Sequence, residues 1–353
     1  MISVMIKSQY DVNEKVSNKV VDLSVNVNPL GMPESVKALL KEKLGDLCEH
    51  YPDGKCYDLV KTIARHKQVF SKNILCVAGV DDAVYRIVYA KNPRKALLLA
   101  PTYEDYERAL ANVKCEINYH VLKKENNFQI TETILDELTA DIEIFFLCNP
   151  NNPTGKVIPK DLLQMIVQHC SIKDIMIIID ESFIGFLDEP ENFTAKNLIK
   201  DYKNLIVIDG FSKLYAMPGI RLGFCLSSDE AFLERMFLAG QVWNISAISQ
   251  LAGIYALNDC DYLEKTHDFI IREKRWLLKE LSALEILVIG NDANYIFFEA
   301  PFPNTRERLR RDNILLRDCK QFKGLANEFC RVAIKSNDEN RKFIQALKKL
   351  KSI

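Results

Sequence analysis

FSKLYAMPGIRLG, Phe211 to Gly223, is the stretch on which the fold prediction depends. It follows the apolar run Leu205 to Ile208, which is typical of a buried strand, and it places Lys213 and Arg221 around a tight turn. A lysine amine that is desolvated by burial becomes a nucleophile able to form an imine with an aldehyde. A Ser-Lys pair beside a strand is also common in surface turns, so the interpretation depends on other segments.

A second buried strand is predicted to end in an acidic residue. The run Ile175 to Ile179 is mostly β-branched, and Asp180 follows it. Open α/β sheets bind ligands at the carboxyl ends of their strands, where Asp180 could make a charge-assisted hydrogen bond to a pyridine nitrogen. The alternatives for Asp180 are a helix cap or a solvated loop. Lys213 and Asp180 together indicate pyridoxal 5'-phosphate (PLP), with Lys213 as the imine lysine and Asp180 keeping the ring protonated as an electron sink.

Two further motifs supply groups for the same ring. CNPNNPTGKVIP follows the apolar run Ile144 to Cys148, and its Asn152 is a candidate donor to the phenolic oxygen of the cofactor. A plain turn is the alternative for this loop, because NPTG is rich in turn residues. PTYEDY supplies Tyr103, which we expect to lie flat on the pyridine ring, and Tyr106, which we interpret as a packing residue.

The cofactor phosphate is assigned to two segments. Gly79 permits a sharp turn after a short strand, and the amides of Val80 and Asp81 then begin a predicted helix, where anions bind. Asp81 is alternatively a simple N-cap. Ser212 and Arg221 are expected to complete the phosphate site.

The order GVDD, PTY, NPNNPTG, DESF, FSK and then Arg221 resembles the fold-type I PLP enzymes of the class I/II aminotransferase superfamily over nearly the whole chain. This resemblance implies an α/β fold with a large, mainly parallel, seven-stranded-type sheet covered by helices at residues 33–245. A smaller α+β domain, residues 1–32 plus 246–353, would close over the substrate. Strand-like and helix-like segments also alternate from Pro33 to Ser228, which favours a parallel sheet independently.

Two N-terminal motifs narrow the resemblance to one branch of the superfamily. VNVNPLGMPESV and HYPD, His50 to Asp53, are similar to the histidinol-phosphate aminotransferase branch and to its relative, threonine-phosphate decarboxylase. The branch implies that Asn28 binds substrate. It also implies a homodimer in which Tyr51 reaches the cofactor phosphate of the neighbouring subunit. A surface tyrosine before a Pro-Asp-Gly turn is the alternative.

The C-terminal region carries two arginines, Arg317 and Arg331, that could converge on a substrate carboxylate, a phosphate or one of each. The string RDC, an aromatic residue, GL and RVA is closer to the decarboxylase. The predicted function is therefore decarboxylation of a small O-phospho-L-amino acid, threonine or serine phosphate, to an amino alcohol phosphate. The alternative is an aminotransferase that moves an amino group between glutamate and a small phosphorylated carbonyl compound. A catalytically silent paralogue is disfavoured, since it would not need Lys213.

Three positions depart from the usual pattern of the superfamily. Phe183 stands where many transaminases have a tyrosine donor, which leaves Asn152 as the donor we can name; the decarboxylase also has phenylalanine here. Gly210 replaces a common phosphate-binding Ser or Thr, and Val80 replaces a small polar residue. Phosphate binding would then rely more on backbone amides, Ser212 and Arg221.

Composition excludes several other classes of protein. A net charge of -1 gives no reason to expect nucleic acid or an anionic membrane as partner, and no apolar run has the roughly 18 residues of a membrane span. The ten cysteines contain no C-x-x-C pair, so neither a metal site nor a disulfide framework is predicted. Reduced thiols and the lack of a secretory signal favour a cytoplasmic location.

Overall fold

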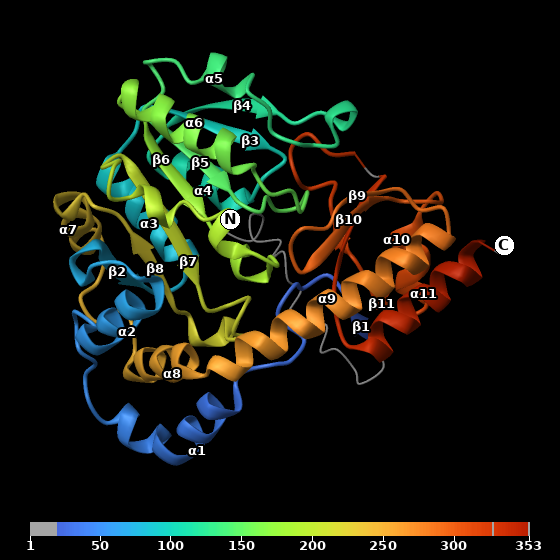
Figure 1. Cartoon of the computed structure of the whole chain (residues 1–353), viewed down its shortest axis with the longest axis horizontal. Coiled ribbons are helices and arrows are strands. Elements are labelled where there is room, and N and C mark those ends of the chain that lie inside the picture. Colours follow the sequence, from blue (N-terminus) through green and yellow to red (C-terminus); the bar gives the residue numbers. More distant parts are fainter. Residues whose placement is uncertain (1–19, 327, 352–353) are drawn as a thin grey trace, which may run out of the picture.

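The computed structural model describes residues 20–326 and 328–351. Its centre is a seven-stranded sheet in the order β2-β8-β7-β6-β5-β3-β4 (Figure 1). Neighbouring strands from β7 to β4 are parallel, whereas β8 runs antiparallel to both of its neighbours. The strands are β2 Ile74–Val77, β3 Lys95–Ala100, β4 Glu116–Val121, β5 Ile144–Cys148, β6 Met176–Asp180, β7 Leu205–Gly210 and β8 Gly223–Leu226. The predicted large, mainly parallel sheet is confirmed.

Helices cover both faces of this sheet. In β5, Phe146 belongs to a core shared with α3, α4 and α7, whereas its neighbour Phe145 belongs to a core shared with α2, α6 and α8. Side chains of a strand alternate between faces, so a strand with two apolar faces needs this double cover. The helices are α1 Glu34–Cys48, α2 Tyr57–Lys67, α3 Val80–Lys91, α4 Glu104–Asn112, α5 Ile134–Glu137, α6 Lys160–Ile172, α7 Glu230–Leu238 and α8 Ala247–Asn258.

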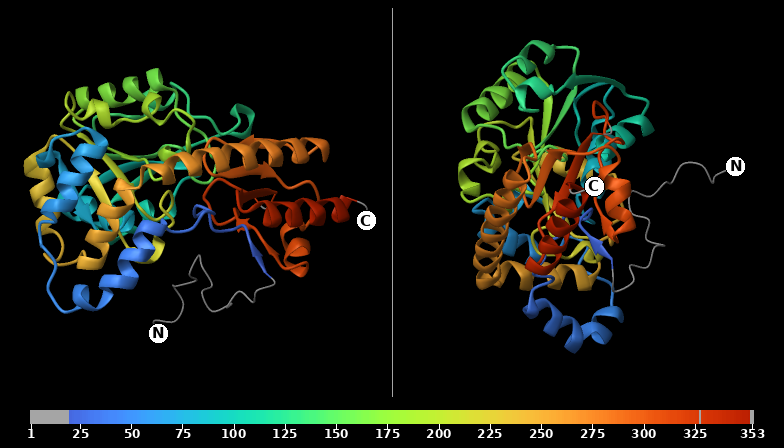
Figure 2. Two further views of the ribbon diagram at one scale, coloured as in Figure 1. Left: turned by 60° about the horizontal axis from the view of Figure 1, so that its bottom comes forward. Right: turned by 90° about the vertical axis from the view of Figure 1, so that its right-hand side faces the viewer.

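A second sheet lies beside the first, as the resemblance implied. It is antiparallel, in the order β12-β13-β10-β9, and a short parallel pair, β1-β11, accompanies it. Figure 2 shows α9 running from α8 along the second sheet, where it contacts β9 and α11. The elements are β1 Val21–Asp22, α9 Cys260–Ala283, β9 Val288–Gly290, β10 Tyr295–Glu299, α10 Thr305–Arg311, β11 Ile314–Leu315, β12 Arg317–Asp318, β13 Phe329–Ala333 and α11 Asn337–Lys351.

α8 and α9 are separate helices, because α8 ends before Asp259 and α9 begins after it. α8 packs on α1 and α2. The domain limits 33–245 and 1–32 plus 246–353 stay a prediction, and residues 1–19 of the smaller domain lie outside the described residues.

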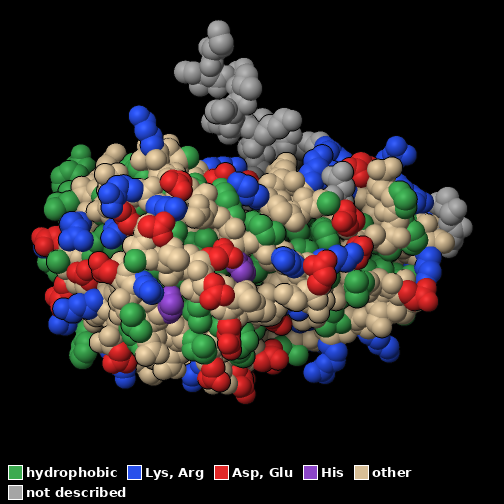
Figure 3. Space-filling model, turned by 90° about the horizontal axis from the view of Figure 1, so that it is seen from above, with side chains coloured by type: hydrophobic (Ala, Val, Ile, Leu, Met, Phe, Trp, Pro, Cys, Tyr) green, Lys and Arg blue, Asp and Glu red, His purple; other side chains and the backbone are tan. Residues whose placement is uncertain are grey.

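The surface carries charges of both signs, and most of the cysteines are buried. Acidic and basic side chains are interspersed on the face shown in Figure 3. All ten cysteines are free, and eight of them are buried. Within the described part of the chain, no group of His, Cys, Asp and Glu could hold a metal ion. None of the described helices has the length and apolar character needed to cross a membrane.

Candidate active site

A cavity of about 350 Å³ lies at the carboxyl ends of the central strands, where the second sheet approaches. This volume is in the range of small-molecule sites. Lys213 and Asp180 both line the cavity, as a ring shared between them requires. The predicted site residues along its wall are Val80, Asp81, Tyr103, Asn152, Asp180, Ser212, Lys213, Arg221, Arg317 and Arg331. The structure does not place Gly79, Asn28 or Tyr51 in this wall.

Asp180 ends β6 and is 3% exposed. Its Oδ2 accepts a hydrogen bond from the Tyr106 hydroxyl at 2.6 Å, and its Oδ1 accepts from the Ser182 amide at 3.0 Å and from the Ser182 hydroxyl. Burial raises the pKa of Asp180, and these hydrogen bonds oppose the rise. A cationic ring nitrogen beside Asp180 would lower this pKa and so favour the ionised carboxylate.

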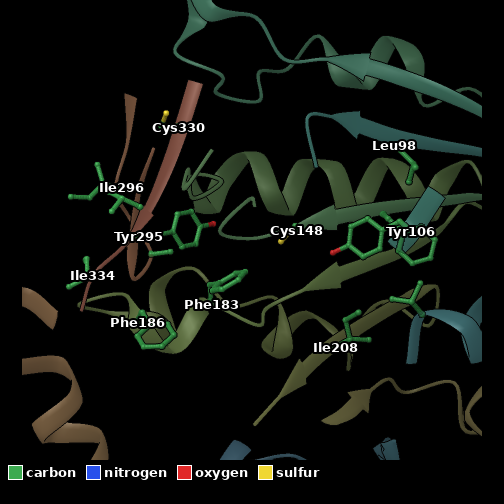
Figure 4. Packing of buried hydrophobic residues seen from close by; sticks show 14 of the residues in the cluster. Leu98, Tyr106, Cys148, Phe183, Phe186, Ile208, Tyr295, Ile296, Cys330 and Ile334 are labelled. Carbon is green, nitrogen blue, oxygen red and sulfur yellow. The ribbon is translucent and has the colours of Figure 1, made fainter. Parts of the chain in front are cut away.

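Tyr106 is therefore more than the packing residue that the sequence suggested. Its ring stacks on Phe146, with centroids 5.0 Å apart, and Figure 4 shows its hydroxyl pointing inward toward Cys148. Burial raises the pKa of Tyr106 well above its ordinary value, so the phenol remains a donor to Asp180. The i+3 spacing from Tyr103 was the available signal, since it places both rings on one side of α4.

The predicted phosphate end is built from an arginine lying on a turn. A Cβ added at Gly79, whose φ is +97°, would lie 2.9 Å from Arg221 Nη2. Glycine therefore lets the guanidinium approach the start of α3. Arg221 Nη2 donates to Asp81 Oδ2 at 3.0 Å, and the Tyr103 hydroxyl donates to Asp81 Oδ1 at 2.8 Å. Asp81 thus links the arginine to the aromatic ring.

The departures at Gly210 and Val80 have one cause. A Cβ at Gly210 would lie 3.1 Å from Val80 Cγ2 and 3.3 Å from the Leu222 carbonyl oxygen. The valine methyl group thus occupies space that a Ser or Thr at position 210 would need. The small Gly210 therefore leaves room for the larger Val80.

Asn152 connects the two halves of the cavity. Its Oδ1 accepts a hydrogen bond from Arg331 Nη1 at 2.5 Å. Because a guanidinium group only donates, Arg331 fixes the amide orientation, and the Asn152 Nδ2 is left on the opposite side as a donor. This orientation agrees with the donor role predicted for Asn152. Phe183 lines the cavity with its ring edge-to-face with Tyr295 at 5.3 Å, and it offers no hydroxyl.

Arg317 and Arg331 are brought together by strand pairing. They are direct partners in the antiparallel pair β12–β13, where opposite side chains on one face lie close together. Arg317 packs over the Phe322 ring at 5.2 Å and lies 3.6 Å from the Glu104 carboxylate. Arg331 packs over the Tyr295 ring at 5.1 Å. Both arginines line the cavity, and their predicted contact with the substrate stays a prediction.

Asn28 lies outside the cavity wall and contacts the turn that carries Lys213, so its predicted contact with the substrate stays a prediction. Its backbone amide donates to the Lys213 carbonyl at 3.1 Å, and its side chain donates to the Leu214 carbonyl and to Thr266. It thus holds the lysine turn from behind. Asn26 lines the cavity instead, and its buried Nδ2 has no hydrogen-bond partner among the described residues.

The residues present fit PLP. An amine and a buried carboxylate line one cavity, and an arginine lies against a glycine turn at a helix start. Tyr51 lies apart from the wall and is 82% exposed. Its predicted role in a neighbouring subunit stays a prediction.

Comparisons with known proteins identify the family and relatives of similar fold. The family model "Aminotransferase class I and II" matches residues 18–347. Threonine-phosphate decarboxylase of Salmonella typhimurium is 36% identical over 94% of this chain and 91% of its own length. Histidinol-phosphate aminotransferase of Caldicellulosiruptor saccharolyticus is 28% identical over 94% and 92%. The crystal structure of histidinol-phosphate aminotransferase from Clostridium acetobutylicum superposes with a TM-score of 0.87 at 28% identity, covering 94% and 99%.

Proposed function

The chain belongs to the class I and II aminotransferase family, and from this premise we propose that it binds PLP and decarboxylates a small O-phospho-L-amino acid, threonine or serine phosphate, to an amino alcohol phosphate. The observation that carries the proposal is the pairing of Arg317 with Arg331 across two strands, in the wall that also contains Lys213 and Asp180. Two guanidinium groups suit a substrate with two anionic groups. The 36% identity to a threonine-phosphate decarboxylase supports the same choice.

Each residue has a separate task in this proposal. When bound, PLP supplies an electron sink for the pair released from a bond at the amino-bearing carbon. Asp180 holds the positive charge of the ring nitrogen, and Lys213 binds the cofactor and later moves a proton to or from the reacting carbon. The two arginines orient the carboxylate. The direction in which they hold the carboxylate would decide whether carbon dioxide or a proton is removed from the amino-bearing carbon.

The alternative is amino transfer between glutamate and a small phosphorylated carbonyl compound, which the histidinol-phosphate aminotransferase relatives support. Incubation with phosphothreonine, phosphoserine and histidinol phosphate, each with and without 2-oxoglutarate, separates the two reactions by mass analysis of the products. Carbon dioxide and an amino alcohol phosphate without keto acid are the expected result. A strict need for 2-oxoglutarate would establish the alternative.

We further propose a homodimer in which Tyr51 contacts the neighbouring cofactor phosphate, a role that its exposure supports. Inactive Lys213→Ala and Tyr51→Ala subunits, mixed in one dimer, should then recover activity, because one of the two sites has both residues. Verified mixed dimers that stay inactive would contradict a shared site. A cytoplasmic location stays a prediction from the free thiols.

A further inference from the structure

Tyr51 is exposed, yet one of its faces is covered. The Trp243 ring packs against it, with centroids 4.8 Å apart and planes inclined by 38°. Aromatic pairs at such distances stabilise each other beyond the effect of the area they bury. Trp243 is itself 57% exposed, in the segment that joins α7 to α8. The tyrosine therefore has a preferred direction before any partner subunit arrives.

The whole turn that carries Tyr51 rests on the Trp243 segment. A Cβ at Gly54 would lie 2.8 Å from Val242 Cγ1 and 3.5 Å from Trp243 Nε1, so no space separates the two segments. Gln250, in α8, donates to the Asp53 carbonyl at 2.9 Å and holds the same turn from a second side.

The Trp243 segment is in turn attached to the helix that begins at the phosphate turn. Asn244 Nδ2 donates to Asp82 Oδ2 at 2.8 Å, and the same carboxylate oxygen accepts from the Ala78 amide and from Arg86 Nε, each at 2.9 Å. Asp82 thus joins the strand end before Gly79, the first turn of α3 and the Trp243 segment.

Arg86 completes this attachment and is 4% exposed. Its Nη1 donates to the carbonyls of Met236 and Phe237 at 3.2 and 3.1 Å, near the end of α7. A Cβ at Gly240 would overlap the Arg86 guanidinium, so glycine is required for this close approach. Asp82, Arg86 and Asn244 are joined by these hydrogen bonds, and together they form the clamp. The Arg86 side chain is buried whereas the Asp82 side chain is 27% exposed, so losing this carboxylate would leave a buried guanidinium charge unpaired.

We propose that Trp243 is a positioning residue for Tyr51, and that the clamp fixes Trp243 to the start of α3. The inference rests on the proposed function, in which Tyr51 contacts the neighbouring cofactor phosphate. One subunit would then present its tyrosine from the same rigid unit that forms its own phosphate turn. Trp243 acts through Tyr51 and does not itself touch the cofactor.

The test is a double-mutant cycle on cofactor affinity. Tyr51→Phe and Trp243→Ala should each raise the Kd for PLP about tenfold, which corresponds to one hydrogen bond to a charged group. The double variant should be no worse than either single variant, because both remove the same contact. Trp243→Phe should restore most of the affinity. Phe70→Ala, which removes another exposed aromatic residue, is the control and should bind PLP like the wild type.

Several outcomes would overturn the inference. Additive losses in the double variant, or wild-type affinity in Trp243→Ala, would show that the tryptophan does not act through Tyr51. Wild-type affinity in Tyr51→Phe would remove the contact on which it depends. Absence of a visible cofactor band in the wild type would instead refute the proposed function, so the two failures are distinguishable. Circular dichroism checks that each variant is folded.

The role of the clamp can be tested separately through the fluorescence of Trp243. The chain has two tryptophans, so in a Trp276→Phe background the emission comes from Trp243 alone. Asn244→Ala removes one donor to Asp82, and iodide should then quench the emission more strongly than in the background protein. The Kd for PLP should rise about two- to threefold. Unchanged quenching with unchanged affinity would show that the clamp does not hold Trp243.

Discussion

The cofactor half and the substrate half of the cavity are built in different ways. Asn152, Asp180 and Lys213 follow or end the adjacent parallel strands β5, β6 and β7, whose register places Cys148 opposite Asp180. Arg317 and Arg331 instead meet through antiparallel pairing in the second sheet. Parallel strands deliver their end groups to one edge in chain order, whereas the arginine pair depends on how a second sheet docks. The first half should therefore supply the groups that react with the cofactor, and the second should bind and orient the substrate.

The largest effect is expected in the cofactor half. Lys213→Ala should lower kcat by about 10⁴-fold, since both the attachment of the cofactor and the proton transfer depend on this amine. Borohydride should no longer fix the cofactor to the protein, which mass spectrometry checks. A persisting covalent adduct would mean that another lysine holds the cofactor. Lys320→Ala, which changes an exposed lysine outside the cavity wall, is the control.

The next largest effect should appear in the substrate half. Arg317→Ala should raise the KM for phosphothreonine about 10- to 100-fold through loss of charge-assisted contacts, while the Kd for PLP stays unchanged. Arg331→Ala should raise KM at least as much and also weaken PLP binding, because Arg331 orients Asn152. Steady-state kinetics and PLP titration measure both. A loss of PLP affinity in Arg317→Ala would contradict the division into halves.

A smaller effect should follow from Tyr106→Phe, which keeps the ring and removes the donor to Asp180. We expect kcat to fall about 10-fold, as for loss of one hydrogen bond to a charged group, with KM nearly unchanged. The pH titration of the visible cofactor band should also shift, because the Asp180 carboxylate is less stabilised. Tyr119→Phe is the matched control outside the cavity. A pure KM effect would assign Tyr106 to the substrate half.

The smallest catalytic effect is expected for Glu181, the residue that follows Asp180. Glu181 accepts from the Ala195 amide and the Thr194 hydroxyl, each at 2.6 Å, and burial raises its pKa from 4.5 to about 7. The folded protein then binds more protons than the unfolded chain between pH 4.5 and 7, so its stability falls as pH rises through this window.

Glu181→Gln removes this titration and should flatten the pH dependence of stability by on the order of 2–3 kcal/mol across the window, with kcat at pH 7 unchanged. Denaturant unfolding at several pH values measures the difference. An identical slope in the variant and the wild type would mean that Glu181 does not titrate there. A lower kcat would place Glu181 in the cofactor half with Asp180.

Local patterns predicted residues that line the cofactor half of the cavity, and the reason is physical. β5 and β6 are entirely buried, so their apolar runs are unmistakable, and the polar residue that follows each run must lie at the sheet edge. Such patterns did not indicate that Tyr106 donates to Asp180 or that Asn26 lines the cavity. Tyr106 looks like any aromatic residue of an amphipathic helix until its hydroxyl is seen to reach Asp180 across 74 residues.

The sequence alone determined the alternating strand and helix order and the choice of Lys213, Asp180, Asn152 and Arg221, because strand burial and turn chemistry are local properties. Tertiary structure decided the rest: the register that sets Arg317 opposite Arg331, the exchange of space between Val80 and Gly210, and the contact of Tyr51 with Trp243. These contacts join segments far apart in the chain. Their geometry follows from how whole layers pack, which no short run of residues specifies.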